Sequence, residues 1–212
     1  MSFLIDFILH IDNHLVSIVN TFGGWTYLIL FLIIFIETGA VILPFLPGDS
    51  LLFAASALAA NPSYHLNIWL LVLLFWSAPL LGDSLNFIIG KRTGSHIKPG
   101  SFLGKFIKES DLTKTRNFFE KHGAIAISLA RFMPIIRTMA PFIAGGSGMP
   151  FKDFFKFNFL GATAWMALCC AGGFYFGNFP IVKEHFSLVI IGIIVVSLLP
   201  AVIGFLKKKL SH

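Results

Sequence analysis

The chain has 212 residues, of which 56% are hydrophobic and 12% are charged, and its mean hydropathy is +0.83. Soluble domains carry about 25% charged residues, so this composition excludes an ordinary soluble protein and indicates a polytopic membrane protein built as one compact domain. The net charge of +6 comes from Lys and Arg residues that all lie at or after Lys91, beside apolar stretches. That placement excludes the solvated basic stripe of a nucleic-acid-binding protein and fits the positive-inside rule.

The first predicted element is an amphipathic helix over residues 3–19, within an N-terminal segment 1–22. Its apolar side chains recur on one helical face and its polar ones on the other. Such a helix lies in the membrane interface, and its lack of Lys and Arg suits the non-cytoplasmic side. The segment has no basic n-region and no small-residue cleavage site, so we do not expect a secretory signal.

A broken hairpin is predicted next, followed by a full span. An apolar arm over residues 25–43 meets the sequence Leu43-Pro-Phe-Leu-Pro-Gly-Asp-Ser50, whose prolines and glycine interrupt a helix. The second arm, residues 51–60, would rise only about 15 Å, half of the hydrocarbon core, and so cannot cross it. We therefore predict a re-entrant hairpin, and after it a transmembrane helix over residues 66–90.

The basic segment 91–123 separates this part from a second hairpin and is predicted to form a cytoplasmic amphipathic helix that ends at Gly123. Residues 124–149 contain Pro134 and Pro141, which we expect to interrupt a helix, and so predict another re-entrant hairpin. A span over residues 157–179 follows. A last transmembrane helix, residues 186–206, precedes three lysines that place the C-terminus in the cytoplasm.

The two parts repeat each other. Residues 45–50 resemble residues 132–138 with one insertion, and Phe87-Ile-Ile-Gly90 resembles Phe174-Tyr-Phe-Gly177 at the end of each following span. The predicted fold is therefore an all-α polytopic membrane protein with an inverted repeat of re-entrant hairpin plus transmembrane helix, over residues 25–90 and 124–179. The interfacial helix and the extra C-terminal helix complete it. Broken helices in inverted repeats are typical of secondary transporters, with the site near the bilayer midplane.

Four charged residues lie in apolar surroundings and are the main candidates for a functional site. Arg131 and Arg137 are the only charged residues between His122 and Phe151, and an arginine at bilayer depth costs about 2.5–3.5 kcal/mol on insertion scales. Arginine presents a planar fork that suits phosphate, so we predict that both bind an anionic head group. Glu37 is either an interfacial carboxylate at a helix end or a proton acceptor on a transport path. Asp49 either caps the following helix or takes part in proton transfer together with Glu37.

Several further residues have weaker signals. Ser50 and Thr138 each adjoin a key charge and are candidate contacts to the head group. Asp83 and Asn86 lie one turn apart on the predicted span and either face the site or belong to its cytoplasmic end. The adjacent Cys169 and Cys170 are interpreted as packing residues. No G-x-S-x-G, H-E-x-x-H, P-loop or Cys/His metal pattern occurs, so we expect no enzyme, no cofactor and no metal site.

Two long motifs resemble a known family. They are Glu37-Thr-Gly-Ala-Val-Ile-Leu-Pro-Phe-Leu-Pro-Gly-Asp-Ser50 and Ala130-Arg-Phe-Met-Pro-Ile-Ile-Arg-Thr-Met-Ala-Pro-Phe-Ile-Ala-Gly-Gly-Ser-Gly-Met149. The chain resembles, over nearly its whole length, the DedA family of bacterial inner-membrane proteins, which is related to the SNARE-associated/VTT domain. The resemblance implies lipid handling: some members are implicated in moving undecaprenyl phosphate, others in membrane-potential homeostasis, and eukaryotic relatives scramble phospholipids. The family's acidic pair maps onto Glu37 and Asp49, and its arginine pair onto Arg131 and Arg137.

Three hypotheses of function follow. The leading one is a proton-coupled translocase of a lipid phosphate, either undecaprenyl phosphate or a phospholipid, with head-group binding by the arginines and proton coupling by the carboxylates. The alternative in transport is a proton-coupled antiporter of small cations or drugs. The third is a structural membrane protein whose four charges form static ion pairs. The sequence leaves open which lipid moves, in which direction, and whether the protein is a homo-oligomer.

Overall fold

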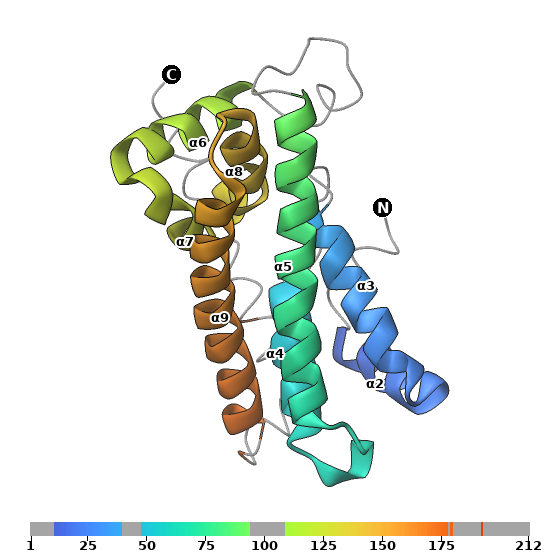
Figure 1. Ribbon diagram of the computed structural model, residues 1–212. Helices are drawn as coiled ribbons and strands as arrows, with labels where there is room; N and C mark the ends of the chain where they lie inside the picture. Colours follow the sequence, from blue (N-terminus) through green and yellow to red (C-terminus); the bar gives the residue numbers. More distant parts are fainter. Residues whose placement is uncertain (1–10, 40–47, 94–108, 178, 180–191, 193–212) are drawn as a thin grey trace, which may run out of the picture. The chain divides into compact units, whose positions relative to one another are not determined.

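The computed structural model describes residues 11–39, 48–93, 109–177, 179 and 192. Within those ranges the chain is helical and contains no strand (Figure 1). Helices α2 to α9 have these bounds: α2 Ile11–Phe22, α3 Trp25–Gly39, α4 Gly48–Ala59, α5 Ile68–Thr93, α6 Glu109–His122, α7 Ala126–Ala130, α8 Pro134–Gly146 and α9 Phe151–Phe176, with 3₁₀ turns η1 at Pro62–Tyr64 and η3 at Gly123–Ile125.

The chain forms two compact units, each of which draws on both halves of the sequence. Unit 1 comprises Met1–Ile33, Pro47–Phe75 and Met166–His212, and unit 2 comprises Ile34–Leu46 and Trp76–Trp165. Helices α3, α5 and α9 therefore each contribute residues to both units. The predicted repeats, residues 25–90 and 124–179, do not coincide with these units.

Two helices among the described residues are long and apolar enough to cross a membrane. Both α5 and α9 have 26 residues, which corresponds to about 39 Å against a hydrocarbon core of about 30 Å. The prediction of long apolar helices at residues 66–90 and 157–179 is confirmed. However, α9 begins at Phe151, because the Pro150 carbonyl accepts from the Asp153 and Phe154 amides and Asp153 suits a helix N-terminus. Lys152 and Lys156 consequently lie in its first turns.

The arms of the first predicted hairpin are short helices. With 15 and 12 residues, α3 and α4 would measure about 22 Å and 18 Å, so neither reaches across a hydrocarbon core. Residues 40–47, where the hairpin turn is predicted, lie outside the described residues. Helix α4 begins at Gly48 rather than at residue 51, so Asp49 and Ser50 belong to its first turn instead of preceding it.

The predicted bounds of other helices differ more from those in the structure. The N-terminal helix extends to Phe22, three residues beyond the predicted end, while residues 1–10 lie outside the description. Pro141 does not interrupt its helix, because α8 continues from Pro134 to Gly146. The actual break lies at residues 131–133, between α7 and α8, where Pro134 takes the first helical position that proline favours. The predicted last helix, residues 186–206, is outside the description.

Unit 1 is held together by close contacts between small residues. A Cβ added to Gly177 would lie 2.6 Å from the Cα of Ala57, so the end of α9 approaches α4 more closely than a side chain allows. Helix α2 also packs on α4 and buries Leu15 and Val19, which lie one turn apart. At the start of α5, the Asn67 side chain accepts hydrogen bonds from the amides of residues 69 and 70.

The core of unit 2 lies around α8. Helix α6 presents Leu112 to Met139, Phe142 and Ile143 of α8, as its apolar stripe predicts. Gly123 has a φ of +60°, a left-handed conformation that glycine adopts without strain, and it ends α6 where expected. A second cluster joins α5, α7, α8 and α9; it consists of Phe87, Ile127, Ala130, Ile136, Ala140, Ala144 and Phe154.

Large apolar side chains are also exposed, in rows on the outer faces of the helices. On a soluble monomer such faces are rarely extensive, whereas in a bilayer they contact acyl chains. The rows agree with the membrane assignment made from composition. They include Leu28, Leu32 and Ile36 on α3, Leu81, Leu85 and Ile88 on α5, and Phe155 and Phe159 on α9.

Candidate functional site

The break between α7 and α8 carries both candidate arginines. Arg131 follows the last residue of the short helix α7, and Arg137 lies in the first turn of α8. The N-cap residue of α8, Met133, makes no side-chain capping hydrogen bond. Because the first amides of a helix have no partner within the helix, this terminus is suited to bind an anion.

Arg137 forms an ion pair with Glu37. Its Nη2 atom donates to Glu37 Oε1 at 2.8 Å, and the two side chains are 12% and 5% exposed. Glu37 therefore lies in the protein interior, and its interpretation as a proton acceptor or as an interfacial carboxylate stays a prediction. The pair joins the last turn of α3 to the first turn of α8 within unit 2.

Glycines place Glu37 beside α5. A Cβ added to Gly82 would lie 3.0 Å from both the Gly39 amide nitrogen and the Phe35 carbonyl oxygen. The end of α3 thus contacts the backbone of α5 directly, at the residue before Asp83. A larger residue at position 82 would separate the two helices and move Glu37 away.

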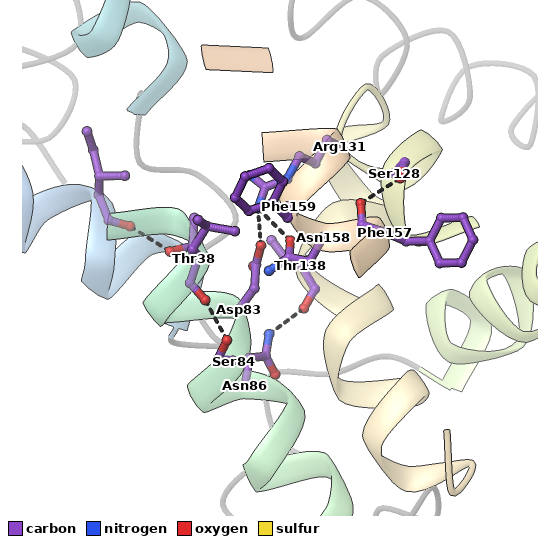
Figure 2. A network of polar contacts seen from close by, with 12 residues as sticks. Thr38, Asp83, Ser84, Asn86, Ser128, Arg131, Thr138, Phe157, Asn158 and Phe159 are labelled. Atoms are coloured by element: carbon purple, nitrogen blue, oxygen red, sulfur yellow. Dashed lines mark hydrogen bonds and ion pairs between the residues drawn. The ribbon is translucent and has the colours of Figure 1, made fainter. Parts of the chain in front are cut away.

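Arg131 has partners on two other helices. Its Nη2 atom donates to Asp83 Oδ2 on α5 and, at 2.8 Å, to Asn158 Oδ1 on α9. Figure 2 shows the two acceptors converging on the guanidinium group of Arg131. All three side chains are buried, with Asn158 only 1% exposed. Arg131 therefore links α5, the α7–α8 break and α9.

The approach of α9 to α7 makes the Asn158 contact feasible. A Cβ on Gly161 would lie 2.8 Å from the Cα of Ser128 and 3.3 Å from Cδ of Arg131. On the same face, Ser128 donates to the Phe157 carbonyl at 2.6 Å (Figure 2). The site geometry thus requires a glycine at position 161, although this residue lies outside the segment that carries the two arginines.

Asn86 and Thr138 form another part of the same polar cluster. The Asn86 side-chain amide donates to the Thr138 carbonyl oxygen at 2.9 Å, and Asn86 is fully buried (Figure 2). The prediction left open whether Asp83 and Asn86 face the site or belong to a helix end near the interface. Both lie in the interior and contact the segment that carries the arginines.

Among the described residues whose ion pairs are given above, the charges of the cluster balance. Asp83 interacts electrostatically with Arg137 as well as with Arg131, so the two ion pairs form one group of two cations and two anions. Buried charges need such compensation, because isolated ones cost far more than paired ones. The hydroxyl and amide groups around them supply further hydrogen bonds.

Comparisons with known proteins decide the family. The VTT domain matches residues 46–175. The chain is 49% identical to Protein DedA of Escherichia coli over 98% of its own length and 94% of that protein. The chain belongs to the DedA family. It is also 40% identical to an uncharacterized membrane protein of Mycobacterium tuberculosis, over 87% of this chain and 81% of the relative.

A further relative is Inner membrane protein YghB of Escherichia coli, at 30% identity over 96% of this chain and 92% of the relative. No solved structure matches the chain. This DedA-family chain is accordingly a membrane protein, as its composition and its exposed apolar helices indicated.

The acidic pair inferred for the DedA family divides between the units. Glu37 belongs to unit 2 with both arginines, whereas Asp49 and Ser50, in the first turn of α4, belong to unit 1. Asp49 is partly exposed and Ser50 is buried. The prediction that Asp49 joins the same cluster stays a prediction. Sequence reasoning missed Asn158, which has the ordinary signature of a polar residue within an apolar span.

Unit 1 also contains an apolar cavity of about 390 Å³ between the first turns of α5 and the last turns of α9. The described residues that line it are uncharged, and none of the candidate site residues is among them. Trp69 and Cys170 lie in its wall.

Proposed function

We propose that this DedA-family protein is a transporter, not an enzyme, and that it moves a lipid phosphate across the bilayer in a proton-coupled manner. The observation that carries the proposal is the buried cluster of Arg131 and Arg137 with their carboxylate partners, beside the start of α8, whose N-cap residue makes no side-chain hydrogen bond. The resemblance stated above makes undecaprenyl phosphate and phospholipids the first substrates to test.

The arginines would hold the phosphate group. Guanidinium groups bind phosphate oxygens through parallel N–H···O bonds, and the first amides of α8 add donors at the positive end of the helix dipole. Thr138, the fifth residue of α8, would contribute a hydroxyl. Ser50 would contribute another if the first turn of α4 faces the same site. The lipid tail would remain in the bilayer.

Proton coupling would follow from competition for the arginines. Since the cluster is already neutral, an arriving phosphate adds uncompensated negative charge. Uptake of a proton by Glu37 would release Arg137 for the phosphate and keep the site close to neutral. Asp49 would be a second proton acceptor. This competition favours movement of phosphate and proton together.

The inverted repeat gains support from the packing inside each unit. In unit 2 the end of α5 packs on α8, where a Cβ on Gly90 would lie 2.8 Å from the Cα of Phe142. In unit 1 the end of α9 packs on α4 through Gly177, the counterpart of Gly90 in the sequence repeat. Each second hairpin arm thus packs on the span of the other repeat, as a two-fold relation requires.

For localisation we propose the bacterial inner membrane, the location in the printed name of the relative YghB. The 61–65 and 180–185 segments would face the periplasm. The basic 91–121 segment and the C-terminus would face the cytoplasm, according to the positive-inside rule. The oligomeric state is not part of the proposal.

The alternative is a proton-coupled antiporter of small cations or drugs that supports membrane-potential homeostasis. It would require Glu37 to bind the cargo, but Glu37 is engaged with Arg137. That engagement favours anion over cation transport.

A transport assay in reconstituted vesicles distinguishes the lipid-phosphate translocase from the antiporter of cations or drugs. Purified protein is incorporated into liposomes with a fluorescent lipid phosphate, and a membrane-impermeant reductant reports how much probe reaches the outer leaflet. We expect the wild type to exchange the whole pool and an Arg131→Gln/Arg137→Gln variant to match protein-free vesicles. Proton flux that responds to added sodium, potassium or ethidium, with no movement of the lipid probe, would replace the translocase by the antiporter.

A further inference from the structure

Arg131 is held by two acceptors of different charge. Asp83 and Asn158 both accept from its Nη2 atom, one as a carboxylate and one as a neutral amide. The three come from α5, the α7–α8 break and α9, so the contact is not local in sequence. A phosphate approaching Arg131 therefore meets a position that an internal anion already occupies.

The internal anion and a phosphate cannot both be present at full charge. Phosphate monoesters carry about −1.5 to −2 charges near neutral pH. Among the described residues, the charged groups near Arg131 include Asp83 on α5 and, through Asp83, Arg137 with its partner Glu37. In this buried group a second anion at Arg131 would leave two adjacent like charges, which is strongly unfavourable at low dielectric.

We propose that Asp83 is the anion that a phosphate group displaces from Arg131, and that Asn158 keeps Arg131 in place during the exchange. This inference rests on the proposed function and adds a competitor and a positioning residue to the same site. Displacement needs no large motion: Asp83 loses the contact by accepting a proton or by rotating its side chain.

Asn158 has the properties that such an exchange requires. Its Oδ1 atom accepts from Arg131 at 2.8 Å and carries no charge, so it does not compete electrostatically with phosphate. Its Nδ2 atom lies beside Asp83, is buried, and meets no acceptor in good geometry within the described residues. An entering phosphate oxygen would give that donor a partner.

The experiment measures binding of dodecyl phosphate and of inorganic phosphate to the full chain purified in maltoside detergent. We expect Asp83→Asn, which keeps the side-chain shape and removes the competing charge, to bind dodecyl phosphate about tenfold more tightly than wild type. Asn158→Asp adds a competitor and should bind about tenfold more weakly. Tighter binding of the dodecyl ester than of inorganic phosphate identifies a lipid as the source of the group.

A variant in which Asp83 and Arg131 exchange their charges tests whether this pair has a purely structural role. If the pair only stabilises the fold, Asp83→Arg/Arg131→Asp restores both thermal stability and binding. Under the proposal it restores stability but not binding. Should Asp83→Asn fail to fold, Asn158→Asp still gives a directional readout.

The outcomes also separate this inference from the proposed function. A wild type that binds dodecyl phosphate, with an Asp83→Asn variant that folds and binds no more tightly, overturns the competition and leaves the transporter standing. If Asp83→Asn does not fold, undiminished binding by Asn158→Asp has the same consequence. A wild type that binds neither probe overturns the proposed function and the inference together.

Discussion

Arg137 and Glu37 are 100 positions apart in the sequence, yet the guanidinium Nη2 of one lies 2.8 Å from the carboxylate Oε1 of the other. The contact joins a helix from the first predicted hairpin to a helix from the second. Because both side chains are shielded from solvent, each charge depends on the other for compensation. Substitutions in this pair are therefore expected to change both the stability of unit 2 and the proposed transport.

Removal of one member of this pair should be costly. We expect Arg137→Ala to destabilise the protein by about 3–5 kcal/mol, because Glu37 would remain buried without its partner. The double variant Glu37→Ala/Arg137→Ala should be less destabilised than the sum of the single variants. Thermal denaturation of detergent-purified protein measures these changes. Additive losses would show that the two side chains do not interact.

Arg137→Lys separates charge from geometry. Lysine keeps the positive charge beside Glu37 but lacks the planar fork. We expect near-normal abundance in membranes together with at least a tenfold loss of lipid-phosphate transport, about the effect of one charge-assisted hydrogen bond. Normal transport by this variant would argue that bidentate contact is not required, and equal losses of abundance and transport would favour a static structural pair.

Gly161→Ala tests the close approach of α9 to α7. Overpacking costs about 1–3 kcal/mol, against a gain of about 1 kcal/mol in helix propensity. The new methyl group would also press on Arg131, so transport should fall more than stability. The matched control is Gly172→Ala in the same helix, where the nearest atom of Phe53 would be 3.6 Å away. We expect the control to be neutral or stabilising. Equal effects at both positions would contradict the model of the site.

Glu37→Gln should uncouple transport from protons. The amide keeps the size of the side chain and a hydrogen-bond acceptor for Arg137, but it cannot take up a proton. We expect this variant to bind lipid phosphate and to move it at a rate that no longer depends on an imposed pH gradient. The measurement is the vesicle assay at several gradients. A variant that still follows the gradient would assign coupling to another group.

Topology can be tested with single cysteines in a Cys169→Ser/Cys170→Ser background. Lys114→Cys on α6 and Ser63→Cys in η1 are both on exposed positions. We expect an impermeant maleimide added to intact spheroplasts to label position 63 and not position 114. Labelling of position 114 from outside would refute the cytoplasmic assignment of the basic segment and, with it, the inverted repeat.

The sequence predicted the helical class, the two long spans and the importance of Glu37, Arg131 and Arg137, because hydropathy and isolated charges are local signals. It did not predict the partner of Arg131. Asp83 resembled a helix-end residue, and Asn158 an incidental polar residue, because their proximity depends on contacts that are distant in the sequence. Helix α5 packs on α8 at Gly90, and α9 packs on α7 at Gly161. Pro141 was misread because a proline inside a helix is tolerated where neighbouring segments satisfy the released carbonyl.

The central claim is that both buried arginines contact the phosphate of a bound lipid. The chain contains only four arginines, Arg92, Arg116, Arg131 and Arg137, so ¹⁵N-arginine labelling gives a small set of signals that Arg→Lys variants can assign. Solid-state NMR in liposomes then measures dephasing of each guanidinium signal by lipid ³¹P. We predict strong dephasing of Arg131 and Arg137 by a bound lipid phosphate, lost when an excess of a phosphorus-free alkyl sulfonate competes for the site, and weaker dephasing of Arg92 and Arg116. Dephasing confined to Arg92 and Arg116 would contradict the account.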